Sequence, residues 1–89
     1  HMSVVRDFCG HGLGRLFHDS PEVVHAGRPG SGPELKPGMF FTIEPMINMG
    51  KKDVFHDDDG WSIRTKDRKP SAHYEHTVMI RGDGAEILT

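Results

Sequence analysis

Short runs in which apolar and polar residues alternate dominate the hydrophobic pattern of this chain. Alternation with a period of two is typical of a strand that buries one face. In residues 72–80, for example, Val78 and Ile80 fall on one side, whereas Glu75 and Thr77 fall on the other. The segments that the pattern and the β-branched or aromatic content predict to be strands are residues 4–9, 39–47, 61–65, 72–80 and 85–88. Pro45 has no N–H to donate, so we expect it to stop the second of these strands.

Glycine, proline and acidic residues separate the predicted strands. Residues 27–38 contain three prolines and four glycines, so we expect a surface loop that ends in a Pro-Gly turn. Residues 48–60 are polar and are predicted to form a second loop. Asp83-Gly84 is a strong hairpin-turn signal, and no segment shows sustained helical periodicity. The sequence therefore predicts a mainly β fold, an antiparallel sheet of four or five strands with long loops.

The composition predicts a thin core. Leu, Ile, Val and Phe make up 20 of the 89 residues, only just above the content at which chains stop folding. We therefore expect the apolar surface to be covered by a second copy of the chain or by a segment that is missing from it. The alternative is a small, marginally stable monomer.

Charge and cysteine content limit the partners and the compartment. The net charge is −2 with both signs interspersed, so no basic stripe of the kind that a phosphate backbone requires is present, and we expect no nucleic acid partner. There is no apolar run near twenty residues and no signal peptide, which predicts no membrane partner. The single cysteine, Cys9, cannot form an internal disulfide. These features favour the cytoplasm, and we interpret His1-Met2 as a cloning remnant.

Three residues stand out as candidate metal ligands. His11 lies in a glycine-rich run over residues 9–21, where small residues let a metal or substrate approach the backbone. Glu44 follows one predicted strand and Glu75 lies within another. Imidazole and carboxylate ligands together suit Zn, Mn, Fe or Co. Spacing alone leaves the structural alternative open, because single histidines and strand glutamates commonly have no metal.

A series of short motifs follows in order over nearly all of residues 3–89. They are GHGLGR with FH at residues 10–18, LKPGM at 35–39, FTIEPM at 41–46, DGW at 59–61, TKD at 65–67 and SAHYEHT at 71–77. This series resembles the C-terminal part of the type I, bacterial methionine aminopeptidases, which belong to the pita-bread metallopeptidases. The resemblance implies an α+β pita-bread domain of which this chain, lacking the N-terminal half, contains the C-terminal part.

The resemblance implies a dinuclear site of two divalent metal ions. His11 matches a ligand of one metal, and Glu75 matches a carboxylate that bridges both. Glu44 matches a ligand that also acts as acid/base for the attacking water. These implied roles agree with general chemistry, because two cations acidify a shared water and a carboxylate relays its proton.

The resemblance also implies a peptide substrate that begins with methionine. His18 matches a histidine that contacts the substrate near the scissile amide, so it is expected to be catalytic as well as substrate-binding. Phe17 and Trp61 match residues near the pocket for the methionine side chain. Leu16 stands where many relatives have glycine, which predicts altered packing beside Phe17.

The resemblance also implies two aspartates and a further histidine from the N-terminal half of the family's domain, and no residue of this chain matches them. Asp67 and Asp83 lie in turn-like contexts and match no family ligand. We therefore expect the chain alone to hold at most one metal, weakly, to show little or no activity, and to self-associate through exposed sheet surface. The alternative hypothesis is a non-catalytic pita-bread module that binds peptides or proteins.

Overall fold

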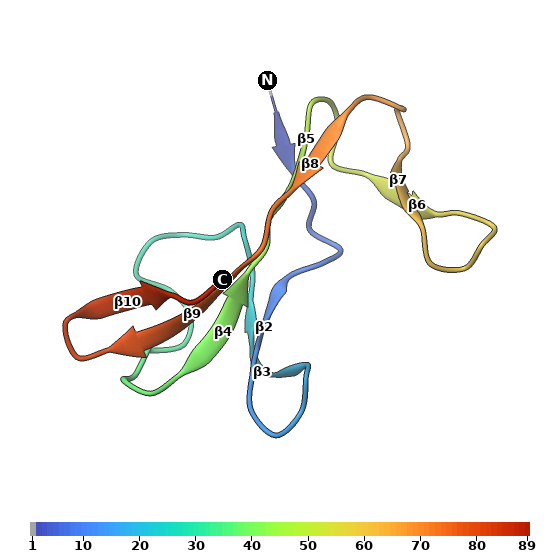
Figure 1. Cartoon of the computed structure of the whole chain (residues 1–89). Helices are drawn as coiled ribbons and strands as arrows, with labels where there is room; N and C mark the ends of the chain where they lie inside the picture. The colour runs from blue at the N-terminus through green and yellow to red at the C-terminus, as the bar shows by residue number, and fades with distance from the viewer. Residues whose placement is uncertain (1) are drawn as a thin grey trace.

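One long antiparallel hairpin organises the computed structural model, which describes residues 2–89 (Figure 1). Its first arm contains β4 (Phe40–Ile43), β5 (Met46–Asn48) and β6 (Val54–His56), and its second arm contains β7 (Ile63–Thr65), β8 (Ser71–His73) and β9 (His76–Arg81). The register never shifts, because Phe40 lies opposite Met79, Met46 opposite His73 and Val54 opposite Thr65. Segments far apart in the sequence are thereby placed side by side.

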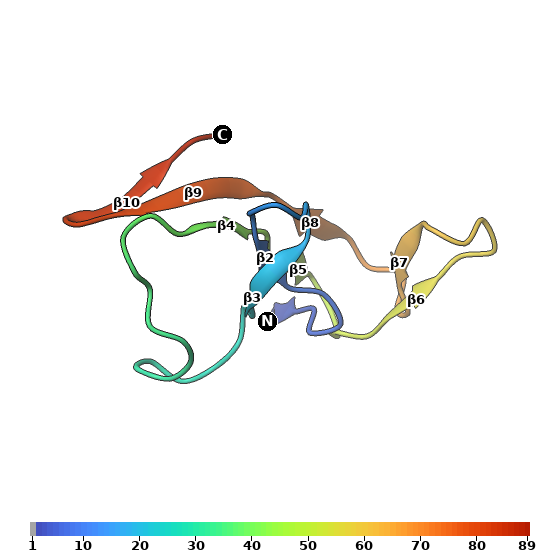
Figure 2. The same cartoon turned by 90° about the horizontal axis from the view of Figure 1, so that it is seen from below.

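The remaining strands extend the hairpin at one end and along its middle. β10 (Gly84–Ile87), β2 (Gly10–Gly12) and β3 (Asp19–Val23) complete a five-stranded antiparallel sheet in the order β10-β9-β4-β2-β3. β1 (Ser3–Val4) joins β5 and β8 in a three-stranded sheet, and β6 pairs with β7 alone. The molecule is elongated, 42 × 29 × 21 Å, with β6 and β7 at one end and the loop between β3 and β4 projecting near the other (Figure 2).

Both arms of the hairpin are interrupted at the same level. β4 ends and β5 begins around residues 44–45, and β8 ends and β9 begins around residues 74–75. Pro45 contributes to the break because it has no N–H for the ladder. Ile43 pairs with His76 before the break and Met46 pairs with His73 after it. Since the register is unchanged across the break, Glu44 lies opposite Glu75.

The core is as thin as the composition predicts. Among the described residues, the buried hydrophobic side chains are Val5, Phe41 and Val78, and the last two lie opposite each other on β4 and β9. Many large apolar side chains stay exposed, including Leu16, Phe17, Trp61 and Tyr74. The apolar surface that this chain buries is therefore small for its length.

The strand predictions are right in kind and wrong in several bounds. Over residues 2–89 there is no helix, and the pairs are antiparallel, as expected. The predicted strands at 39–47 and 72–80 are each divided by the break, and the predicted loop at 48–60 contains β6. Of the predicted strand at 4–9, Val4 alone lies in a strand, at the end of β1, and β2 begins directly after residue 9. Within the described part of the chain, ten strands form where four or five were expected, because tertiary pairing recruits short segments that alone have no strand pattern.

β3 was missed because its sequence, Asp-Ser-Pro-Glu-Val, shows no apolar alternation and contains Pro21. It lies at the edge of the five-stranded sheet, where a proline is tolerated because the outer N–H groups have no partner strand. Over residues 2–89, no helix is long and apolar enough to span a membrane.

Candidate metal centre

Three side chains from three parts of the sheet converge on one point. His11 is the middle residue of β2, Glu44 directly follows β4, and Glu75 directly precedes β9. Each offers one ligand atom, and these atoms lie within 4.8 Å of one another. Within residues 2–89, this trio is the one group of three or more His, Cys, Asp or Glu side chains whose ligand atoms lie this close together.

The glycines beside His11 allow neighbouring strands to approach closely. A Cβ on Gly10 would overlap the carbonyl of Thr42 on β4, and one on Gly12 would overlap the carbonyl of Ser20 on β3. The β2–β3 register also shifts between His11 and Gly12, and such irregularities re-aim a side chain. The expectation that these glycines make room for metal or substrate is thus corrected at Gly10 and Gly12, where the space is filled by backbone.

The ring of His11 is oriented so that Nε2 points at Glu44. Its Nδ1 lies 3.2 Å from the carbonyl oxygen of Gly12. A carbonyl can only accept, so Nδ1 is the nitrogen that donates to it, and in the neutral ring Nε2 is then the nitrogen that carries the lone pair. Nε2 lies 3.4 Å from Glu44 Oε2, and the two side chains are only 12% and 15% exposed.

Glu44 is held by two hydrogen bonds, one to its carboxylate and one from its backbone N–H. The hydroxyl of Thr42 donates to Glu44 Oε2 at 2.7 Å, and the backbone N–H of Glu44 donates to Nε2 of His25 at 3.0 Å. Burial lowers the pKa of His25, the nearby Glu44 opposes this shift, and His73 adds to it. The neutral form that accepts the Glu44 N–H is thereby favoured.

The donor set fits a divalent cation of the kind that the family implies. Nε2 of His11 and Oε2 of Glu44 are both acceptors, so their approach to 3.4 Å is favourable only with a cation or a proton between them. Two ligands bonded to one ion at about 2.1 Å and near-tetrahedral angles are separated by roughly this distance. Glu75 adds a second carboxylate, and nitrogen with oxygen donors suits Zn, Mn, Fe or Co.

The substrate-binding candidates divide into two places. His18 and Phe17 lie beside His11, with ring centroids 4.4 Å and 5.6 Å from its imidazole. An open cleft of about 550 Å³ adjoins them and is lined by His11, His18 and Glu44 among others. Trp61 is 80% exposed and lies in the loop between β6 and β7, which projects away from the five-stranded sheet in both views (Figures 1 and 2). The structure brings Phe17 and His18 to the candidate centre and leaves Trp61 apart from it.

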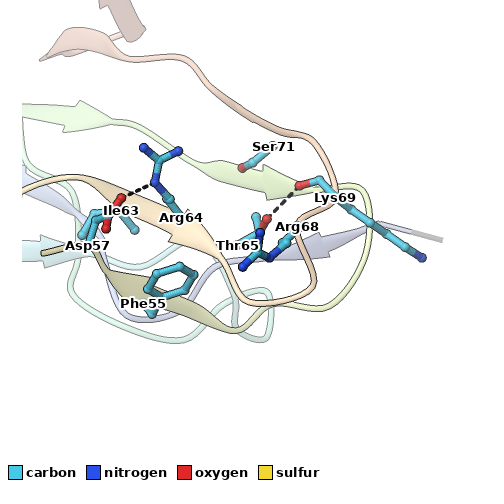
Figure 3. A pocket seen from close by; sticks show the side chains of 8 residues that line it. All are labelled: Phe55, Asp57, Ile63, Arg64, Thr65, Arg68, Lys69 and Ser71. Atoms are coloured by element: carbon cyan, nitrogen blue, oxygen red, sulfur yellow. Dashed lines mark hydrogen bonds and ion pairs between the residues drawn. The ribbon is translucent and has the colours of Figure 1, made fainter.

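A larger pocket, about 650 Å³, lies on the β6–β7 hairpin and the loop that follows it (Figure 3). Its lining includes Arg64, which forms an ion pair with Asp57, and Thr65, whose hydroxyl donates to the carbonyl of Lys69. The hydrogen bond from Arg64 is the main cause that lowers the pKa of Asp57. None of the three candidate ligands lines this pocket, so the candidate centre is assigned to the cleft beside His11.

Sequence reasoning missed the two residues that hold Glu44. A signal existed for Thr42, because in a strand it shares a face with Glu44 two residues later. No signal existed for His25, which reaches Glu44 only through the folding of the loop after β3.

The sheet carries a group of one histidine and two glutamates that could hold a divalent metal beside an open cleft, an arrangement typical of metal-dependent hydrolases. The model of metallopeptidase family M24 matches residues 1–82, and the chain belongs to this family. Its fold is that of the methionine aminopeptidases, matched over part of their length.

Methionine aminopeptidases are the relatives found in both sequence and structure. The protein from Escherichia coli (strain K12) is 55% identical over 88 residues, which cover 99% of this chain and 33% of that protein. The protein from Clostridium perfringens is 60% identical, with 99% and 35% covered. The crystal structure of the enzyme from Rickettsia prowazekii superimposes with a TM-score of 0.92 at 53% identity, covering 97% of this chain and 35% of that one. The chain thus spans about a third of the length of these relatives.

Proposed function

We propose that this chain supplies one wall of the active site of a methionine aminopeptidase. Residues 3–89 would form the C-terminal part of a single catalytic domain, preceded by a two-residue cloning remnant. The observation that carries the proposal is the convergence of His11, Glu44 and Glu75 within 4.8 Å in a chain of the M24 family. The similarity to methionine aminopeptidases over 99% of the chain supports it.

The proposed cofactor is a pair of divalent ions, Co, Mn, Fe or Zn, held by His11, Glu44 and Glu75 together with ligands from outside this chain. When bound, such ions would acidify water and polarise a peptide carbonyl. Three ligands alone would hold at most one ion, weakly, because affinity follows the number and preorganisation of ligands. We therefore expect little or no turnover from the 89-residue chain by itself.

Glu44 is the proposed acid/base. Its Oε2 accepts a hydrogen bond from the Thr42 hydroxyl, so we assign the transfer of a proton from water to the leaving amine to Oε1. His18 would donate or accept a hydrogen bond at the scissile amide, since its ring stacks edge-on beside His11 at the cleft. Phe17, 73% exposed, would provide one wall of the methionine pocket. Trp61 is proposed for the same pocket from the resemblance alone, because the β6–β7 loop that carries it projects away from the five-stranded sheet.

The substrate would be a peptide or nascent chain with methionine at its N-terminus, and the compartment would be the cytoplasm. The chain alone would self-associate, because exposed apolar side chains and unpaired edges such as β10 favour association.

A chimera tests the proposal. In it, residues 3–89 replace the matching third of the E. coli methionine aminopeptidase, and methionine release from a Met-Ala-Ser peptide is measured with each of the four metals. We expect release by the chimera and its loss in Glu75→Ala. A chimera that folds but releases no methionine under any metal would contradict the proposed enzyme and favour the non-catalytic module.

A further inference from the structure

The hydroxyl of Thr42 lies between two of the proposed metal ligands, in a position to fix both. Thr42 is 1% exposed and belongs to β4, next to β2 in the five-stranded sheet. The backbone N–H of His11 donates to its Oγ1 at 3.0 Å. The same oxygen donates its proton to Glu44 Oε2 at 2.7 Å.

The direction of this relay is fixed by chemistry. A backbone N–H can only donate, so Oγ1 must accept from His11, and a carboxylate can only accept, so the hydroxyl proton must point to Glu44. Consecutive hydrogen bonds of this kind polarise and strengthen one another. The position of the His11 backbone on one strand is therefore coupled to the rotamer of the Glu44 carboxylate on the next.

We propose that Thr42 is a positioning residue of the metal centre, which sets Glu44 Oε2 at binding distance from His11 Nε2 before any ion arrives. The proposal rests on the proposed function, because it assumes that His11 and Glu44 share an ion. Residues that orient metal ligands through hydrogen bonds contribute to affinity although they never touch the ion.

The sheet offers a matched comparison. Thr77 on β9 lies directly opposite Thr42, is the same residue type and is only half-buried. Its hydrogen bonds to the C-terminal segment use backbone atoms, because the Thr77 N–H donates to Thr89 Oγ1 and the Thr77 carbonyl accepts from the N–H of Leu88. Removal of the Thr77 hydroxyl therefore makes the same chemical change in the neighbouring strand, and it should leave the proposed metal ligands in place.

The test titrates CoCl₂ into the chain and follows the visible absorption of bound Co²⁺, with His11→Ala defining the signal that belongs to this site. Thr42→Val keeps the shape and removes the hydroxyl, and we expect about 10- to 100-fold weaker binding. Thr42→Ser restores the hydroxyl and should restore the affinity. Thr77→Val should bind as the wild type does.

Each outcome decides the question. Equal affinity for Thr42→Val and wild type, or an equal loss in Thr77→Val, would overturn the role of Thr42 while leaving the metal centre intact. Absence of His11-dependent binding both by the chain and by the chimera with the E. coli sequence would refute the metal centre and, with it, this proposal. If Thr42→Val does not fold, NMR of the wild type replaces it. A slowly exchanging Thr42 hydroxyl proton with an NOE to Glu44 supports the role, and its absence overturns it.

Discussion

Glu44 and Glu75 lie opposite each other across the break in the long hairpin. The pairs on either side, Ile43 with His76 and Met46 with His73, share one register, so the two carboxylates fall on the same face. Like charges directly opposite one another destabilise a strand pair. The hairpin therefore holds a repulsion that a bound cation would remove.

The variant Glu75→Gln separates the repulsion between the two carboxylates from the stabilisation by a bound cation. Without metal, the variant should melt at the same temperature as the wild type or up to about 5 °C higher, because one repulsive charge is gone. The rise in melting temperature that Zn²⁺ or Co²⁺ gives the wild type should be lost in the variant, because a ligand that binds only the folded state stabilises it. Differential scanning calorimetry with and without metal measures both.

Glu34→Gln is the control for this measurement, since Glu34 is exposed in the loop before β4. It removes the same charge away from the centre, and its metal-induced shift should match that of the wild type. A Glu75→Gln variant that keeps the full metal-induced shift would exclude Glu75 as a ligand.

Gly12 is expected to be among the positions of the chain least tolerant of substitution. An added Cβ would overlap the carbonyl of Ser20 on the paired strand, so Gly12→Ala must push β2 and β3 apart. We expect a loss of about 1–3 kcal/mol in the free energy of unfolding, measured by urea denaturation. Gly27→Ala, where a Cβ meets no atom within 4 Å, should be neutral or stabilise by less than about 1 kcal/mol. Similar values for the two variants would contradict the close packing of β2.

Sequence reasoning reached the ligands and the β class but not the hairpin that joins them. His11, Glu44 and Glu75 were recognisable in the sequence as residue types that bind metals, and the alternation of apolar and polar residues indicated the two strands that carry Glu44 and Glu75. What the sequence could not show was that these strands pair in one unshifted register, which is what places the two carboxylates opposite each other. Register depends on which face is buried and on the loop that joins the strands, and both are properties of the whole fold.

The expected role of glycine illustrates a second limit. A glycine next to a histidine suggests access for a ligand, but the same residue type is needed wherever backbones meet. Gly12 serves the approach of β3, and only the position of Ser20 reveals this. His25 is a similar case, because its partner is a backbone N–H 19 positions away.

The ion pair between Arg64 and Asp57 predicts a change in pKa on mutation. The hydrogen bond from Arg64 is the first cause that holds the pKa of Asp57 below its ordinary value. Arg64→Gln should therefore raise the pKa of Asp57 toward its ordinary value, which carbon-detected NMR of its carboxyl group would measure. Because the pKa of Asp57 is lower in the folded state than in the unfolded state, the ion pair stabilises the fold at a pH above the ordinary pKa of the carboxyl group. This contribution to stability is lost as the pH falls through the pKa of Asp57 in the folded state.

Arg81→Gln is the matched control for that titration. Arg81 pairs with Glu86 on the β9–β10 hairpin, so its removal should leave the Asp57 titration unchanged. An Asp57 pKa that does not move in Arg64→Gln would show that the ion pair is absent in solution.

Trp61 is the single tryptophan of the chain, so its fluorescence reports the β6–β7 loop alone. At 80% exposure it should be quenched readily by iodide in the isolated chain. If Trp61 lines the methionine pocket, quenching should decrease in the chimera with the E. coli sequence when a slowly cleaved Met peptide is added. The chimera carrying Trp61→Phe supplies the background signal, and unchanged quenching on peptide addition would exclude Trp61 from the pocket.

His25 should support Glu44 from the backbone side. The Glu44 N–H donates to its Nε2, and Glu44 is half-buried, so loss of the acceptor leaves a donor poorly satisfied. We expect His25→Ala to reduce the free energy of unfolding by about 1–3 kcal/mol. The amide of Glu44 should also exchange with deuterium faster than in the wild type, which NMR resolves residue by residue.

The variant His25→Gln distinguishes this role from general packing. A glutamine carbonyl can accept the same N–H, so it should restore much of the protection at the Glu44 amide, whereas His25→Leu should restore volume without protection. Protection equal in His25→Leu and wild type would show that His25 only fills space. A selective loss at Glu44 in His25→Ala and His25→Leu, with recovery in His25→Gln, would establish that the hydrogen bond itself holds this candidate ligand.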